Sequence, residues 1–151
     1  MKTLNDIIGT YTQERFATTA GTQMHNRLRR VFIDGDNTTG DSELVAQILA
    51  HPELVPFFSP VSRCEVLIAG ILNNEFVSRR LDRLLIDEVA RTIRVLDYKT
   101  DTDTHRFYTK YIAQIQEYIS LLKMIYSDYD IQGYILWTHD FSLEKVPVKQ
   151  L

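Results

Sequence analysis

The sequence predicts an α/β fold in which a mixed central β-sheet is flanked by helices. Two observations lead to this class. Three consecutive β-like segments follow a proline-bearing loop, and a long amphipathic stretch and one further β-like segment come after them. At 151 residues the chain fits one domain, because domains commonly run to about 100–150 residues.

Two helices are predicted in the N-terminal third. Apolar residues at helical spacing indicate a helix over residues 21–32, which the stretch DGDNTTGD then ends. A second, short helix is expected over residues 42–50, where Asp41 or Ser42 could cap the N-terminus and a His-Pro pair follows the C-terminus.

The sheet is predicted from four segments. Residues 63–72, 75–86 and 92–99 read as strands, the first two joined by Asn-Asn and the last two by DEVAR, which favours an antiparallel meander. A long amphipathic helix is expected from about residue 105 to 126. The stretch GYILWT, residues 133–138, is then the final strand.

Composition bounds the class of function. The net charge of −3 gives the molecule no general attraction for polyanions. No apolar run approaches the roughly 18 residues that cross a bilayer, and no secretion signal is recognisable, so we expect a cytoplasmic protein with no membrane partner. Cys64 has no second thiol with which to form a disulfide or a cysteine-based zinc site. No G-x-x-x-x-G-K-[ST] motif is present, so no ATP site is expected in this chain.

Charged residues interrupt two of the predicted strands. Asp97 and Lys99 share one face of their strand, with Cα atoms about 6.6–7 Å apart. Asp82 stands among leucines on the preceding strand, and a hairpin can bring it beside Asp97. Two carboxylates that lie close together repel each other unless a cation or a proton intervenes.

Oxygen ligands from separate strands, with positions left open for water and phosphate, suit Mg²⁺. A lysine beside such a site can orient the attacking water and stabilise charge that develops on a phosphate. For an isolated D-x-K, two solvated charges or a weak surface ion pair is the ordinary interpretation. A purely structural role for all these charges requires them to lie apart in space.

The spacing of Asp82, then Asp97-Tyr98-Lys99, then QIQEY resembles the PD-(D/E)XK nuclease superfamily, in particular its RecB-like branch. The upstream GTQMH, with His25, resembles the first motif of that branch. The stretches HPELVPFFSPVSRCEVLIAG, SRRLDRLLID and ILWT resemble the C-terminal nuclease domain of AddA, the helicase–nuclease subunit of AddAB complexes, in its alphaproteobacterial form.

The resemblance implies a restriction-endonuclease-like core over residues 21–140, after an N-terminal lead-in at 1–20 and before a peripheral tail at 141–151. It implies a metal-dependent exodeoxyribonuclease domain of an AddAB/RecBCD-type helicase–nuclease that acts in double-strand break repair and recombination. The implied cofactor is Mg²⁺, with Mn²⁺ as a substitute. The implied partners are DNA, expected to be single-stranded, a helicase portion or chain, and an AddB-like subunit.

The resemblance also assigns roles to residues. It implies that the metal ligands are His25, Asp82 and Asp97, and that the catalytic residues are Asp82, Asp97 and Lys99. The residues implied to support the site or to contact DNA are Gln114 and Tyr118, with Glu65 as an outer ligand or as a support for the ligands. Tyr111 lies on the same stripe of the predicted helix as Gln114 and Tyr118, and Arg79 joins this group from its place near Asp82 and not from the family pattern. For Glu65 an exposed strand acid remains the alternative, and for the two tyrosines plain core packing does.

One position departs from the family pattern. Where S-G-x-h-D is usual, this chain reads Ser78-Arg79-Arg80-Leu81-Asp82. A glycine there allows close approach of the backbone, so Arg79 could crowd the metal or offer a phosphate a charge-assisted hydrogen bond. The alternative function is therefore a catalytically weakened DNA-binding or assembly module of the same fold.

Overall fold

The computed structural model describes residues 3 and 20–148, so most of the expected lead-in lies outside the described residues. Residues 20–28 are helical. The further elements, in chain order, are β1 (Phe32–Asp34), β2 (Asn37–Thr39), α2 (Ser42–Leu49), the 3₁₀ helix η1 (Pro52–Phe58), β3 (Arg63–Leu72), β4 (Glu75–Asp87), β5 (Thr92–Lys99), α3 (Tyr108–Ile125), β6 (Asp130–Trp137) and β7 (Ser142–Val146).

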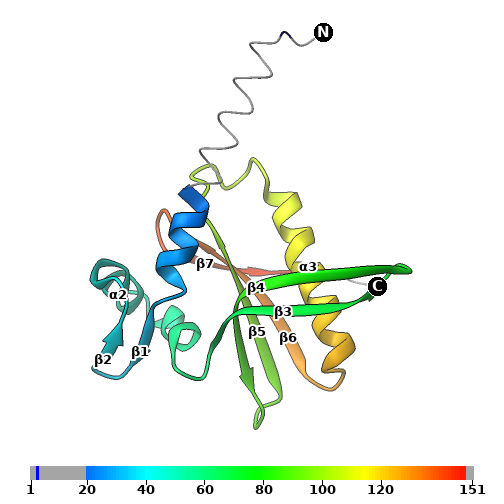
Figure 1. Ribbon diagram of the computed structural model, residues 1–151, viewed down its shortest axis with the longest axis horizontal. Helices are drawn as coiled ribbons and strands as arrows, with labels where there is room; N and C mark the ends of the chain where they lie inside the picture. Colours follow the sequence, from blue (N-terminus) through cyan, green and yellow to red (C-terminus); the bar gives the residue numbers. More distant parts are fainter. Residues whose placement is uncertain (1–2, 4–19, 149–151) are drawn as a thin grey trace.

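The main sheet has five strands in the order β3-β4-β5-β6-β7. The β5–β6 pair is parallel and the other three pairs are antiparallel, so the sheet is mixed. The helix α3 makes the crossover that a parallel pair requires. The predicted α/β class, with a mixed sheet and flanking helices, is confirmed (Figure 1).

Two hydrophobic cores lie on the two faces of the sheet. One forms between α3 and strand residues such as Val95 and Ile135. The other joins Leu28, α2 and η1 to residues such as Leu96. The close seat of α3 depends on Gly133, because a Cβ there would lie 2.3 Å from Ile115 Cγ2.

The helix expected over residues 21–32 is wrong at its C-terminal end. Helical geometry ends at residue 28, and Phe32 begins β1, which pairs with β2 in a hairpin. Asp34 pairs with Asn37, so Gly35 and Asp36 form the two-residue loop, and Gly35 adopts φ +58 in it. The glycine thus marks a hairpin turn and not merely a helix break.

The expected peripheral tail at 141–151 is also corrected. Residues Ser142–Val146 form β7, which pairs with β6 at the edge of the sheet. Phe141, which precedes the strand, and Val146, its last residue, are both buried. Two apolar anchors thus fix a segment that is too short and too polar to read as a strand.

The remaining boundaries agree closely with the pattern. The strands β3 and β5 have the predicted limits, and α3 begins three residues later than expected. The strand expected at 133–138 is β6, which begins three residues earlier, at Asp130, and ends at Trp137. Asp41 caps α2, because its carboxylate accepts hydrogen bonds from the backbone N–H groups of Glu43 and Leu44. Among residues 3 and 20–148, no helix is long and apolar enough to cross a membrane.

Candidate active site

The predicted acids lie where two strands part. Pairing of β4 with β5 ends at Arg83 and Leu96, so the next position on each strand is Asp82 and Asp97. From there β4 continues only with β3, and Figure 1 shows this ribbon turning away from β5. The two carboxylates therefore occupy the fork between the diverging strands.

Tyr98 has the backbone groups that this fork leaves without a strand partner. Its N–H donates a hydrogen bond to Asp82 Oδ2 at 2.8 Å. Its carbonyl oxygen lies 3.2 Å from His25 Nε2. Buried backbone groups must find partners, so the side chains of Asp82 and His25 take the place of the missing strand. The same two bonds to Tyr98 hold both side chains at the site.

Asp82 and Asp97 form a close acid pair. Their side chains are only 13% and 6% exposed. Burial, and next the neighbouring charge of Asp97, raise the pKa of Asp82 to about 8, against the opposing hydrogen bond from Tyr98. Without a cation, the pair therefore retains a proton at neutral pH.

Lys99 is held beside this pair by three groups. Its Nζ lies 2.8 Å from Asp97 Oδ2, donates to Gln114 Oε1 at 2.8 Å and sits 4.3 Å from the centroid of the Tyr111 ring. The Asp97 oxygen is nevertheless buried and receives no aligned hydrogen bond. The lysine thus contributes charge without satisfying that oxygen.

His25 reaches the acids from the helical residues 20–28. A carbonyl oxygen only accepts, so the bond to Tyr98 places the proton of a neutral imidazole on Nε2. The other nitrogen, Nδ1, then presents its lone pair 3.5 Å from Asp82 Oδ1. A metal-ligating histidine commonly has this arrangement, with its second nitrogen bound to a backbone carbonyl.

These residues fit a divalent cation such as Mg²⁺. One nitrogen and two carboxylates approach one another, and Asp97 Oδ2 accepts no hydrogen bond although the Lys99 ammonium lies 2.8 Å away, so this oxygen is available to a cation. Within residues 3 and 20–148, no three His, Cys, Asp or Glu side chains already lie close enough to hold a metal ion. A bound cation would therefore have to draw His25, Asp82 and Asp97 closer together.

Glu65 lies across from Asp82 in the register of β3 and β4. The flanking positions pair, Cys64 with Arg83 and Val66 with Leu81, but this position does not. Glu65 adopts φ 52, a left-handed conformation that is strained for this residue type. Its carboxylate points toward Arg29, 3.5 Å away, and is about one-third exposed.

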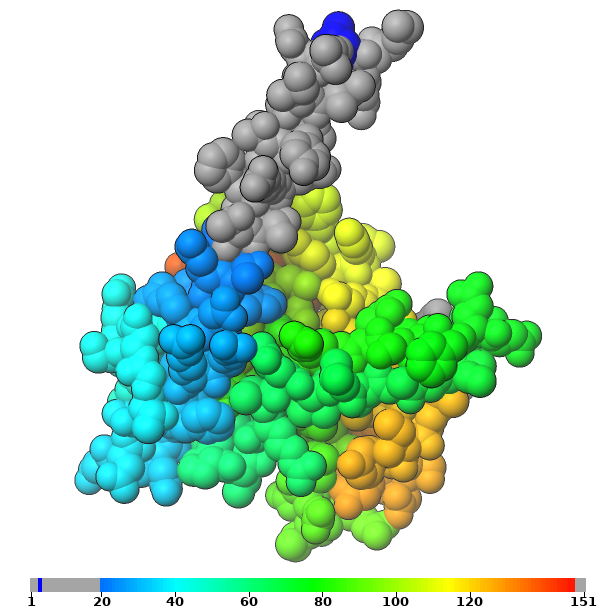
Figure 2. All heavy atoms as spheres, viewed as in Figure 1, coloured from blue at the N-terminus to red at the C-terminus, as the bar shows by residue number. Residues whose placement is uncertain are grey.

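Arg79, where the resembled nucleases usually have a glycine, has its partners on α3 and on its own strand. Its guanidinium forms an ion pair with Glu117 on α3 at 3.0 Å and donates to the Ser78 carbonyl at 2.9 Å. Both residues line a groove of about 480 Å³ between α3 and the β3–β4 ribbon. Figure 2 shows the ribbon projecting from the body of the molecule.

The helix α3 supplies the remaining expected residues. Tyr118 is 3% exposed and belongs to the core, and burial, followed by the charges of Asp97 and Asp82, raises its pKa. Tyr111 packs on Trp137, and its hydroxyl donates a hydrogen bond to Asp101. Both tyrosines therefore lie against the site on the side of α3. Tyr118 is too buried to contact DNA.

Two residues with a part in this geometry were not anticipated. The spacing marked Tyr98 only as an apolar residue between two charges, although its backbone holds both His25 and Asp82. Arg83 is completely buried beneath the same tyrosine. An arginine inside the run LDRLLI was the available signal, because a buried charge requires dedicated partners.

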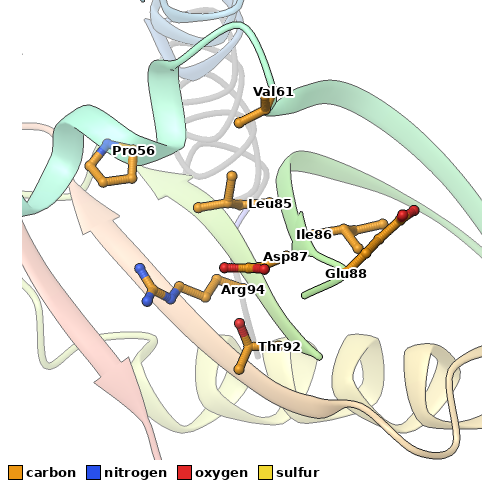
Figure 3. A pocket seen from close by; sticks show the side chains of 8 residues that line it. All are labelled: Pro56, Val61, Leu85, Ile86, Asp87, Glu88, Thr92 and Arg94. Atoms are coloured by element: carbon orange, nitrogen blue, oxygen red, sulfur yellow. The ribbon is translucent and has the colours of Figure 1, made fainter. Parts of the chain in front are cut away.

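A second hollow, of about 470 Å³, lies at the opposite ends of β4 and β5 (Figure 3). Its polar groups do not converge. Asp87 accepts hydrogen bonds from the backbone of the turn that follows β4, and the side chains of Arg94 and Glu88 extend in opposite directions in Figure 3. The fork is therefore the stronger candidate for chemistry.

No protein-family model and no curated protein matches the chain. Among solved structures, the chain is similar to one described as "Crystal structure of SSO0001", with 12% sequence identity and a TM-score of 0.44. The match covers 72% of this chain and 48% of the other, so this chain spans about half the length of that structure.

Proposed function

We propose that this chain is a metal-dependent deoxyribonuclease domain that hydrolyses phosphodiester bonds. The observation that carries the proposal is the convergence of His25, Asp82 and Asp97 at one fork, with Lys99 beside them. Two buried neighbouring acids, one with its pKa raised to about 8 by burial and by the other's charge, are poorly explained as a device for stability. They are well explained as ligands for a divalent cation.

Each residue has a distinct task in this proposal. The carboxylates of Asp82 and Asp97 and the Nδ1 lone pair of His25 would hold Mg²⁺ or Mn²⁺. When bound, the cation would polarise the scissile phosphate and lower the pKa of a water molecule. Tyr98 fixes His25 and Asp82 through its backbone, so two of the three ligands depend on one residue.

Lys99 would act on the reacting groups directly. Once the charge of Asp97 is neutralised, the ammonium is free to hold the attacking water or a phosphate oxygen. Gln114 and Tyr111 keep it in place while it does so. A charge that is already oriented needs no reorganisation during the reaction, and this is the main source of such catalysis.

We also propose, from the resemblance, that the domain is the exodeoxyribonuclease part of an AddAB/RecBCD-type helicase–nuclease in double-strand break repair and recombination. Its substrate would be single-stranded DNA delivered by a helicase portion or chain, with an AddB-like subunit as partner, in the cytoplasm. A restriction-endonuclease-like core is the fold that this assignment implies.

The alternative is a catalytically weakened module of the same fold that binds DNA or takes part in assembly. One observation favours it: Arg79 replaces a glycine and ties the ribbon to α3 through Glu117, which could restrict the approach of a strand. In this case the fork would keep its shape but not support turnover.

Cleavage of labelled single-stranded DNA by the purified chain tests the proposal. We expect cleavage with Mg²⁺ or Mn²⁺, none with EDTA, and none from Asp97→Asn, which keeps the shape of the side chain but loses its charge. Glu88→Gln, an exposed acid at the opposite ends of β4 and β5, is the control and should cleave normally. Metal-dependent DNA binding without cleavage would favour the alternative, and neither binding nor cleavage would refute both.

A further inference from the structure

Arg83 is a buried cation with no acidic partner. Its side chain is fully buried, and none of the ion pairs in the described part of the chain involves it. The guanidinium lies 4.7 Å and 4.6 Å from the centroids of the Phe32 and Phe58 rings. Desolvating a charge in this way is costly unless its donors are satisfied.

Four hydrogen bonds use four of the five N–H donors of the guanidinium. Nη2 donates to the carbonyl oxygens of Leu28 and Val31, both at 2.8 Å. Nη1 donates to Ser62 Oγ at 3.2 Å, and Nε donates to Tyr98 Oη at 2.9 Å. The acceptors come from three separate parts of the chain, so the planar guanidinium of this one side chain joins all three.

The bonds to Leu28 and Val31 fix the segment that carries His25. Leu28 is the last helical residue of 20–28, where carbonyl groups lack partners within the helix and the helix dipole is negative. A buried cation at this end therefore holds the helix by both hydrogen bonding and charge. His25 lies one turn earlier on the same helix.

The bond from Arg83 to Tyr98 fixes the residue against which His25 packs. The Tyr98 ring is stacked on Phe58 and packs edge-on against the His25 ring, with centroids 5.2 Å apart. Its backbone bonds both His25 and Asp82. Arg83 thus holds the histidine helix and the strand that receives it. It follows Asp82 in the chain, but its guanidinium donates to Tyr98, Ser62, Leu28 and Val31 and not to His25, Asp82 or Asp97.

We infer that Arg83 is the positioning residue of the metal site, which sets the distance between His25 and the acids at the fork. This inference rests on the proposed function in so far as His25 is a ligand. A lysine at position 83 would keep the charge but could not bridge the helix, Ser62 and Tyr98 at once. A lost positioning contact commonly weakens metal affinity by about 10–100-fold.

The first test uses the metal-free protein. In nuclear magnetic resonance spectra of the full chain, wild-type protein should show cross-relaxation between the rings of His25 and Tyr98, and Arg83→Lys should lose it. Leu122→Ala, which creates a cavity in the core on the other face of the sheet, controls for lower stability. This variant should keep the cross-relaxation between the two rings. If Arg83→Lys fails to fold, Tyr98→Phe removes only the acceptor of Nε and should weaken the same ring contact.

The second test measures Mn²⁺ affinity by titration calorimetry. We expect Arg83→Lys to bind at least about 10-fold more weakly than wild type, while Leu122→Ala binds as wild type does. Unchanged affinity and unchanged ring contacts in Arg83→Lys would overturn the inference, as would equal losses in Leu122→Ala. If wild-type protein does not bind Mn²⁺, the proposed function fails, and the ring contacts alone decide whether Arg83 positions His25.

Discussion

Replacing Asp82 by asparagine should change how the stability of the metal-free protein depends on pH. The pKa of Asp82 is raised from 3.8 to about 8, first by burial and then by Asp97. The folded state therefore binds this proton more tightly than the unfolded state does. The stability that the proton provides is complete below about pH 4 and is lost as the pH rises through about 8.

The size of the loss follows from the same shift. At pH 7 the solution lies about 3 units above the ordinary pKa, and each unit corresponds to about 1.4 kcal/mol, so the loss between pH 4 and pH 7 is about 4 kcal/mol. This is a large part of the roughly 5–15 kcal/mol that stabilises a domain. Asp82→Asn does not titrate, and its amide oxygen can still accept the Tyr98 N–H.

Urea unfolding in EDTA at pH 5, 6, 7 and 8 measures the effect. The free energy of unfolding of the wild type should fall relative to Asp82→Asn by up to about 1.4 kcal/mol per pH unit. Saturating Mg²⁺ should reduce this slope for the wild type, because the cation replaces the proton. Parallel profiles in EDTA would refute the close acid pair, and with it the geometry on which the site depends.

Three further outcomes are expected. Lys99→Ala should lower the rate of DNA cleavage by about 10²-fold or more, with nearly unchanged Mn²⁺ affinity in calorimetry; cleavage at the wild-type rate would contradict its assigned role. Arg79→Gly should lower the free energy of unfolding by about 1–2 kcal/mol, because it removes a partly exposed ion pair and a hydrogen bond to Ser78 and places a flexible glycine inside β4; a change in binding of labelled single-stranded DNA would show that Arg79 contacts the strand. Gly133→Ala should cost about 1–3 kcal/mol in urea unfolding, because its Cβ would collide with Ile115. Adding Ile115→Leu, which lacks the Cγ2 methyl that the new Cβ would meet, should restore part of that loss. If Gly133→Ala costs nothing, α3 packs less closely on the sheet than described.

Much of the fold could be predicted because its signals are local. Alternation and turn residues placed β3 and β5, and apolar spacing placed α3. The short β1–β2 hairpin and β7 were missed, because their few residues carry too little pattern. Phe32 shows the difficulty: its spacing fits a helix, but its ring is needed over Arg83.

The site divides in the same way. The acids and Lys99 stand out because charges in apolar strands are visible in the sequence, and the structure brings them together. The role of Arg83 could not be predicted, because its bonds to Leu28 and Val31 span more than fifty residues. Such contacts depend on how the helical residues 20–28 pack against the sheet, which no local pattern encodes.

The fork has a consequence for the local dynamics of the sheet. The amide of Tyr98 is protected by the Asp82 carboxylate and not by a strand carbonyl. In a regular ladder, hydrogen exchange requires strands to separate, often through cooperative opening of a whole unit. At Tyr98, rotation of the Asp82 side chain is enough to break the bond. The exchange rate of this amide therefore depends on whether Asp82 keeps its place in the acid pair, while the rates of neighbouring amides depend on opening of the sheet.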